Sequence, residues 1–217
     1  MSKNITKEAA RTHRAIQKKF RLHRRGEDCL PWGALRRVNR SHIGEVLHEL
    51  QYNKGVEIGV RRGAFSKVLC EKNPDLHLTC IDPWDNYHPR YPQEKQDKIY
   101  NKAIQNLSSF IDEGRITILR KSSMDALADF QDESLDFIFI DGNHNFDFVM
   151  MDIICWAKKI KVNGIIAVHD YYSFTWAGIV KAVDAYTHCH HIDPWYTTKE
   201  LEPTAFWVKP PSKGIAM

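Results

Sequence analysis

Two short runs of acidic and imidazole side chains are the residues of this sequence best suited to chemistry. Asp141 and His144 lie in a run Asp-Gly-Asn-His, and His169 and Asp170 form an adjacent pair in which Asp170 comes 29 residues after Asp141. Each run follows an apolar segment that predicts a strand, and the carboxyl ends of neighbouring parallel strands meet at one edge of a sheet. Two carboxylates and an imidazole make a divalent-cation site that is open toward a substrate. The spacing predicts such a site at Asp141, His169 and Asp170; alternatively His169 is a core histidine and Asp141 contacts a cofactor.

A glycine turn earlier in the chain has the form E-x-G-x-x-x-G, with Glu57, Gly59 and Gly63 between a predicted strand and a predicted helix. Glycines there let the backbone approach a ligand and place the N–H groups of a helix start against it. Asp82 ends the next predicted strand, 23 residues after Gly59, where an acid meets the ribose of a nucleoside lying across the strand ends. The dinucleotide fingerprint and the P-loop are absent. Asp82 is alternatively a turn residue.

The elements that position these residues alternate along the chain from residue 55 onward. Short apolar runs alternate with longer amphipathic ones, as in βαβ units with helices on both faces of a parallel sheet. The predicted strands are Gly55–Ile58, His77–Ile81, Ile116–Arg120, Leu135–Ile140 and Ile165–His169, followed by a last pair near His190–Tyr196 and Thr204–Val208. The predicted helices are Ile43–Leu50, Ala64–Lys72, Lys95–Leu107, Phe148–Ile160 and Gly178–Tyr186. We therefore expect an α/β fold with a mostly parallel, seven-stranded sheet.

The glycine turn and the following acid resemble those of the class I S-adenosylmethionine-dependent methyltransferases, over about residues 55–186. In that family the turn cradles the methionine part of the cofactor, and the acid that ends the second strand binds the ribose. The family contacts adenine just after the third strand. The resemblance implies a Rossmann-like fold and S-adenosylmethionine as the cofactor. The cofactor-binding residues that it implies are Glu57, Gly59, Gly63, Asp82, Ser122, Ser123 and Asp141.

The pattern D-G-x-H, followed by a strand that ends in His-Asp, is similar to a subgroup of metal-dependent, small-molecule O-methyltransferases that act on sugar hydroxyls of macrolides, among others. The subgroup binds Mg²⁺ through its strand-end acids and uses the histidine as general base. The resemblance implies that Asp141 and Asp170 bind the metal and that His144, with Asp141, is catalytic. His169 stands where the subgroup often has an acid, and an imidazole suits Mn²⁺, Fe²⁺ or Zn²⁺ better than Mg²⁺.

The first 40 residues are strongly basic, with 12 Lys or Arg against 3 acids, whereas the whole chain carries a net charge of +4. The sequence predicts a basic helical N-terminal extension over residues 1–40 and a methyltransferase domain over residues 41–217. The apolar stripe of Ile16, Phe20 and Leu22 is thin, so the extension is expected to be dispensable for folding. Its charge favours a solvated helix face, or alternatively RNA or another polyanion.

Composition narrows the class of protein further. The chain has 217 residues, 43% of them hydrophobic, which suits one compact domain. No apolar stretch reaches the roughly 18 residues of a membrane span, and the basic start is unlike a signal peptide. The five scattered cysteines indicate free thiols, so we expect a cytoplasmic protein without a membrane partner, monomeric or oligomeric. The aromatic, proline-rich segment 84–93 follows a strand end and is a candidate lid or substrate wall.

Three functions compete with O-methylation of a small, sugar-like acceptor. The first is methylation of RNA or another polyanion held by the basic extension. The second is a non-catalytic interaction module that keeps a cofactor fold, and the third is a nicotinamide-dependent oxidoreductase, which the glycine spacing disfavours. The D/N-P-P-Y type of motif associated with amino methylation of bases is missing, which favours oxygen as the acceptor atom.

Overall fold

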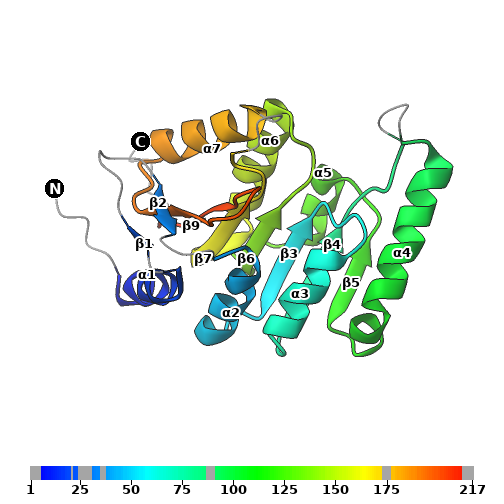
Figure 1. The fold of residues 1–217 in the computed structure, drawn as a ribbon, viewed down its shortest axis with the longest axis horizontal. Helices are drawn as coiled ribbons and strands as arrows, with labels where there is room; N and C mark the ends of the chain where they lie inside the picture. The colour runs from blue at the N-terminus through cyan, green and yellow to red at the C-terminus, as the bar shows by residue number, and fades with distance from the viewer. Residues whose placement is uncertain are drawn as a thin grey trace.

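The computed structural model describes residues 6–20, 22–23, 31–34, 38–86, 91–172 and 177–211. These residues build one twisted sheet with helices on both of its faces (Figure 1). Part of the candidate lid, residues 87–90, lies outside the described residues, as does Cys29. The predicted α/β, Rossmann-like class with its seven-stranded sheet is confirmed, and two further short strands extend that sheet.

The sheet of the described residues has the strand order β1-β2-β8-β9-β7-β6-β3-β4-β5. Strands β3 to β7 are parallel to their neighbours within this group, whereas β9 runs antiparallel to both β7 and β8. The short strands β1 and β2 add to the β8 edge. The strands are β1 (Leu22–His23), β2 (Trp32–Ala34), β3 (Lys54–Ile58), β4 (His77–Ile81), β5 (Ile116–Leu119), β6 (Leu135–Ile140), β7 (Ile160–Val168), β8 (Trp195–Thr197) and β9 (Ala205–Val208).

Helices cover the sheet in two groups, and each group closes one hydrophobic core (Figure 1). One core joins α1 to α4, and the other joins α5, α6 and α7. Strand β6 supplies both cores, since Phe137 and Phe139 face the first and Ile138 and Ile140 face the second. The helices are α1 (Lys7–Phe20), α2 (Ser41–Leu50), α3 (Ala64–Lys72), α4 (Gln93–Asp112), α5 (Ser123–Ala126), α6 (Phe146–Ala157) and α7 (Ala177–Cys189), with a 3₁₀ turn at Leu127–Asp129.

The bounds predicted for α3, β4 and β6 agree with the structure, whereas other predicted bounds differ from it by one to five residues. The helix expected to reach Ile160 ends at Ala157, because Ile160 pairs with Leu135 and so opens strand β7. The strand expected from His190 begins only at Trp195, because α7 continues to Cys189 and the amide of His190 still donates to a carbonyl of that helix. In both places backbone hydrogen bonds outweigh the apolar pattern.

Helix α1 is part of the first core, whereas its thin apolar stripe led to the expectation that the extension is dispensable for folding. Ile16 and Phe20 are fully buried, and Phe20 lies against Phe206 of β9 with ring centroids 5.0 Å apart. Lys19 pairs with Glu45 of α2 across the same interface. The division of the chain at residue 40 stays a prediction, but α1 and Val38 of the extension belong to the core of the domain.

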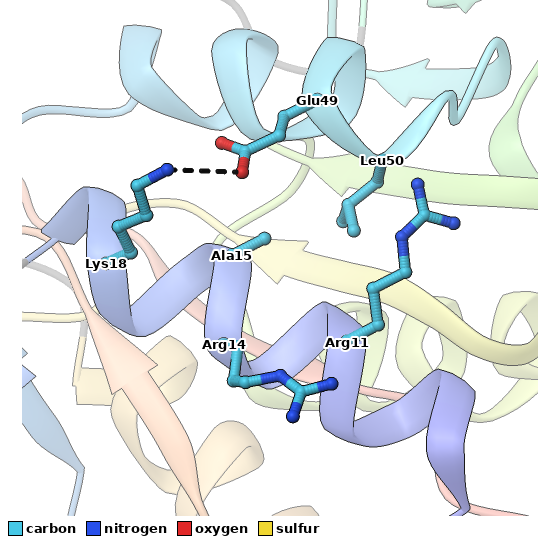
Figure 2. A pocket seen from close by; sticks show the side chains of 6 residues that line it. All are labelled: Arg11, Arg14, Ala15, Lys18, Glu49 and Leu50. Atoms are coloured by element: carbon cyan, nitrogen blue, oxygen red, sulfur yellow. Dashed lines mark ion pairs between the residues drawn. The ribbon is translucent and has the colours of Figure 1, made fainter.

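Three basic side chains of α1 lie at the exposed edge of its contact with α2. Arg11, Arg14 and Lys18 are exposed and line a hollow against Glu49 and Leu50 at the end of α2 (Figure 2). Lys18 pairs with Glu49 at 3.8 Å. Among the described helices, none is both long and apolar enough to cross a membrane.

The packing of α1 generates the first prediction. Truncating the buried ring in Phe20→Ala is expected to lower the free energy of unfolding by about 3–5 kcal/mol, the usual cost of a large core cavity. Arg14→Ala, on the exposed side of the same helix, is the matched control and should change it by less than about 0.5 kcal/mol. Urea unfolding measures both. Equal, small effects would mean that α1 does not stabilise the domain.

Candidate active site

The predicted site residues follow four neighbouring parallel strands and meet at one edge of the sheet. Ile58 at the end of β3 is paired with Ile81 of β4 and with Ile140 of β6, and Ile140 is paired with Val168 of β7. The residues that follow these positions are Gly59, Asp82, Asp141 and His169. The strand register therefore brings together positions that lie up to about half the chain apart.

The glycine turn requires glycine at its first position. Gly59 has a φ of +85°, and a Cβ there would lie 2.0 Å from the carbonyl oxygen of Asp141. Gly63 has a φ of +73°, directly precedes α3, and offers that helix no side-chain cap. Gly63 therefore leaves the first N–H groups of α3 without a side-chain cap, and binding of a ligand by these groups stays a prediction.

Glu57 lies beneath this turn and is only 2% exposed. The Ser66 hydroxyl of α3 donates a hydrogen bond to its carboxyl group. Burial raises the pKa of Glu57 to about 8, although the Ser66 hydrogen bond opposes the shift. Glu57 therefore supports the floor of the turn, and direct contact of its carboxyl group with a cofactor stays a prediction.

Asp82 joins the turn after β3 to the turn after β4. Its two carboxylate oxygens accept hydrogen bonds from the backbone amides of Arg61, at 2.9 Å, and Trp84, at 2.8 Å. Burial raises its pKa, while these two amides act in the opposite direction. Asp82 therefore acts as a turn residue, which is the alternative that the sequence left open. A carboxylate offers about four lone-pair sites in total, so the ribose role is compatible with this geometry and stays a prediction.

The hydroxyls of Ser122 and Ser123 both have partners within the protein. Ser122 caps α5 by accepting from the amide of Asp125, and Ser123 donates to Asp152 at 2.6 Å. Asp152 on α6 is buried, which raises its pKa to about 6. Contact of either serine with adenine stays a prediction. Asp152 has no counterpart in the sequence analysis, because a lone acid within a helix carries no spacing signal.

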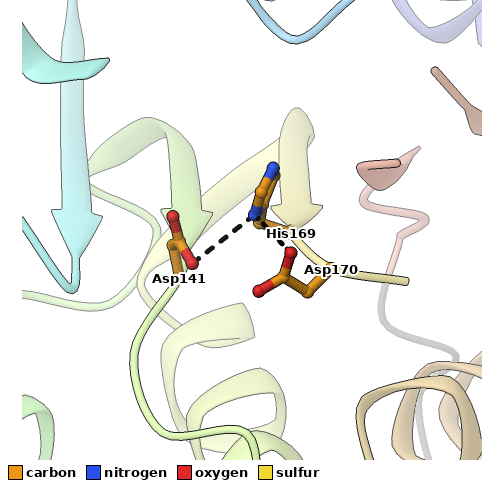
Figure 3. A group of neighbouring side chains, drawn as sticks. All are labelled: Asp141, His169 and Asp170. Carbon is orange, nitrogen blue, oxygen red and sulfur yellow. Dashed lines mark ion pairs between the residues drawn. The ribbon is translucent and has the colours of Figure 1, made fainter. Parts of the chain in front are cut away.

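Asp141, His169 and Asp170 form a compact group, as the sequence predicts. Each residue offers one ligand atom, and these three atoms lie within 4.8 Å of one another. Among the described residues, this group has the side chains and the spacing to hold a metal ion. The Nδ1 atom of His169 faces Asp141 Oδ1 at 3.5 Å and Asp170 Oδ1 at 3.1 Å (Figure 3). Both His169 Nδ1 and Asp170 Oδ1 are buried and make no hydrogen bond with the described residues.

The charges of this group shift one another's pKa values. Burial pushes the pKa of Asp141 upward, but the imidazoles of His144 and His169 and the charge of Arg40 outweigh it, so the net shift is downward. Burial acts to lower the pKa of His169, but the two carboxylates raise it to about 9. Asp170 adopts a left-handed backbone conformation with a φ of +60°, which an aspartate tolerates better than most residues. The group is therefore a strongly coupled, buried cluster.

His144 lies beside this cluster, in the loop between β6 and α6. Its Nε2 atom is 3.3 Å from Asp170 Oδ2 and 3.9 Å from Asp141 Oδ1. The start of α7 supports the loop from behind, since a Cβ at Gly178 would lie 2.7 Å from the His144 carbonyl oxygen. His144 is half-buried, so the ring borders both the acids and the solvent.

Arg40 also reaches the cluster, and the sequence analysis did not single it out. Its Nη1 atom is 2.9 Å from Nε2 of His169 and 3.5 Å from Oδ2 of Asp141. The guanidinium carbon lies 4.9 Å above the ring of Phe65. Arg40 is one of 12 basic residues within the first 40, and no local pattern separates it from the others.

Comparison with known proteins agrees with this geometry. Residues 56–171, more than half of the chain, match a family described as a methyltransferase domain. The chain belongs to this family. The match contains all of the predicted site residues of this methyltransferase domain but excludes Arg40. The predicted relationship to the class I S-adenosylmethionine-dependent methyltransferases is confirmed.

The relatives of the methyltransferase domain are distant. A Sinorhizobium fredii protein, y4gI, is 28% identical to this chain over 131 residues. The aligned segment is 58% of this chain but only 14% of the length of y4gI. The solved structure of a Staphylococcus aureus protein assigned as a caffeoyl-CoA O-methyltransferase is 17% identical to this chain, with a TM-score of 0.56. The match covers 96% of this chain and 93% of the Staphylococcus aureus chain.

Two other solved structures are similar to the methyltransferase domain to the same degree. One, assigned as an O-methyltransferase from Klebsiella pneumoniae, is 14% identical with a TM-score of 0.58, over 94% of this chain and 90% of that one. The other, cofactor-bound Rv0187 from MTB, is 16% identical with a TM-score of 0.55, also over 94% and 90%. At this level of identity the likeness shows the fold.

The buried Glu57 generates a prediction about pH. Because its pKa is about 8 in the folded chain against an ordinary value of 4.5, the folded state keeps a proton that the unfolded state releases between these pH values. The contribution of Glu57 to stability therefore falls as the pH rises from about 4.5 to 8, by an amount on the order of a few kcal/mol. Glu57→Gln should remove this fall, so the variant gains stability relative to the wild type as the pH increases.

Urea unfolding at several pH values measures the difference between the two proteins. Glu71→Gln, on the exposed side of α3, is the matched control and should follow the wild-type curve. Parallel curves for the wild type and Glu57→Gln would contradict the assignment of a raised pKa to Glu57.

Proposed function

We propose that this chain is an S-adenosylmethionine-dependent O-methyltransferase that acts on a hydroxyl of a small, sugar-like acceptor with the assistance of a divalent cation. The observation that carries the proposal is the convergence of Asp141, His169, Asp170 and His144 at the strand edge that also holds the glycine turn. Ligands of open α/β sheets bind at this edge. The two solved structures assigned as O-methyltransferases support oxygen as the acceptor atom.

The cofactor side of the proposed site comprises the glycine turn and Asp82. The turn leaves no space for a side chain at Gly59, so backbone and helix-start amides face the ligand. We assign the methionine part of the cofactor to this turn and the ribose to Asp82. The methyl group would then lie toward Asp141, whose backbone contacts Gly59.

The acidic cluster fits a divalent cation. His169 Nδ1 and Asp170 Oδ1 are buried and face each other at 3.1 Å as an ion pair, but neither makes a hydrogen bond with the described residues, and a bound cation would give both atoms a partner. Asp141, His169 and Asp170 would hold the ion, and the mixed nitrogen and oxygen donors favour Mn²⁺, Fe²⁺ or Zn²⁺ over Mg²⁺. A bound cation supplies Lewis acidity that lowers the pKa of an acceptor hydroxyl.

His144 is the group that would accept the acceptor's proton. Nε2 of His144 would take the proton of the acceptor hydroxyl as its oxygen receives the methyl group. S-adenosylmethionine, when bound, would supply that methyl group from its sulfonium centre, and the bond to sulfur would break to leave S-adenosylhomocysteine. Asp170 Oδ2, 3.3 Å from Nε2, stabilises the imidazolium that forms. The half-buried position of His144 lets a small acceptor reach it from solvent.

The position of the basic residues favours a small acceptor over a polyanion. Arg11 lines a hollow together with Asp136 and Lys161, which lie at the starts of β6 and β7. Asp141 follows the opposite end of β6, roughly 16 Å away at the usual rise per residue of a strand. A polyanion held on this face would therefore have to cross the depth of the sheet to reach His144.

The cysteines support an intracellular location for the proposed reaction. The four described cysteines are free thiols, and two of them, Cys70 and Cys80, are buried. Free thiols are typical of proteins in a reducing compartment. The proposal therefore places the enzyme in the cytoplasm.

Cofactor binding is tested with S-adenosylhomocysteine. Asp82→Asn is expected to weaken its binding roughly tenfold to hundredfold, because a charge-assisted hydrogen bond to ribose becomes a neutral one. Asp85→Asn removes an exposed carboxylate three residues further on and should leave the affinity unchanged. Isothermal titration calorimetry measures both variants, and equal affinities would show that Asp82 is not the ribose ligand.

The acceptor side is tested by separating metal binding from proton transfer. Asp170→Asn should abolish Mn²⁺ binding and methyl transfer but leave S-adenosylhomocysteine affinity nearly intact, because the carboxylate serves the acceptor side. His144→Ala should keep metal and cofactor binding, but its rate of methyl transfer should fall roughly 10²–10⁴-fold, which is the usual contribution of a general base. Chelator treatment should reproduce the Asp170→Asn result, and added Mn²⁺ should reverse it. Full activity after chelation would remove the metal from the proposal.

A further inference from the structure

The backbone next to Arg40 is held in place by the other end of the chain. The amide of Arg40 donates to Glu200 Oε1 at 2.8 Å, and the amide of Lys199 donates to the carbonyl of Val38 at 2.9 Å. Arg40 directly precedes α2, so the helix fixes it on the other side as well. The side chain projects from this rigid position to the ends of β6 and β7, outside the segment that matches the methyltransferase family.

The contact between Arg40 and His169 determines which ring nitrogen carries the proton. An arginine side chain has only donors, so Nε2 of His169 must accept the hydrogen bond from Nη1 at 2.9 Å. A proton on Nε2 would place two N–H groups against each other. While Arg40 donates to Nε2, the ring carries a single proton, on Nδ1, the nitrogen that faces the carboxylates of Asp141 and Asp170. The contact with Arg40 thus opposes the upward shift that the two carboxylates give the pKa of His169.

This arrangement opposes a metal ion in two ways. A histidine binds a metal through a nitrogen that has no proton, and while Arg40 occupies Nε2 the nitrogen that faces the carboxylates has one. The guanidinium is also a permanent positive charge, 3.5 Å from Oδ2 of Asp141. A divalent cation on the same carboxylate would lie close to a like charge.

We propose that Arg40 is a built-in counter-cation of the acidic cluster, which competes with the divalent cation and must leave His169 before the site can load. The inference rests on the metal-assisted function proposed above. The Arg40 side chain is 32% exposed, so it has room to withdraw toward solvent while its backbone stays held. When it withdraws, the proton can move to Nε2 and leave Nδ1 free as a ligand. Arg40 thereby sets how readily the site accepts metal.

The test is the affinity of the full-length protein for Mn²⁺, measured by calorimetry in the absence of cofactor. Arg40→Gln should bind Mn²⁺ roughly tenfold to hundredfold more tightly than the wild type, the equivalent of releasing one charge-assisted hydrogen bond. Arg40→Met, which keeps an aliphatic chain against Phe65, should show the same gain and serves if the glutamine variant does not fold. Arg14→Gln loses the same charge on the exposed face of α1 and should match the wild type.

The outcomes separate the two proposals. Unchanged or weaker Mn²⁺ affinity in the Arg40 variants, with clear binding by the wild type, would overturn the role of Arg40 and leave the metal-assisted function standing. Absence of Mn²⁺ binding in the wild type and in all variants would overturn both. A parallel titration of the wild type with S-adenosylhomocysteine reports on cofactor binding separately from metal binding.

Discussion

The register of β6 between β3 and β7 is the constraint on which the rest of this structure depends. Ile140 is paired with both Ile58 and Val168, so Asp141 follows the strand level with Gly59 and His169. A slip by one residue would exchange the core faces of β6 and would part Asp141 from His169. The slip is prevented by burial on both sides, since alternate residues of β6 belong to different cores. The register of β6 therefore sets both the core packing and the geometry of the site.

The same register explains why Gly59 cannot carry a side chain. The carbonyl oxygen of Asp141 lies where a Cβ would be, because the two strand ends meet so closely. This close approach joins the cofactor turn to the acidic cluster without any intervening side chain. A substitution at Gly59 would consequently disturb both halves of the site, through steric contact and through the positive φ.

The acidic cluster brings several charged side chains together where His169 and Asp170 are buried. Two carboxylates, Asp141 and Asp170, lie among His144, His169 and Arg40, and a left-handed backbone at Asp170 helps to bring them together. Buried atoms without hydrogen bonds and unusual backbone angles are costly for stability, and they collect where a site needs them. The N-terminal residues contribute to both the core and the site, because α1 packs into the first core and Arg40 adds a positive charge beside Asp141.

The sequence alone determined the parts of this protein that are written in local patterns. The strands β4 and β6 and the helix α3 follow from apolar runs and amphipathic spacing, and the glycine turn and the strand-end acids follow from residue types with narrow conformational or chemical roles. Parallel strand order was enough to predict that Asp141, His169 and Asp170 converge. Only the tertiary structure decided that α1 is a core helix and that Arg40 contacts a histidine 129 residues further along the chain. Such contacts depend on which distant surfaces pack together, and a basic residue among other basic residues carries no local trace of its partner.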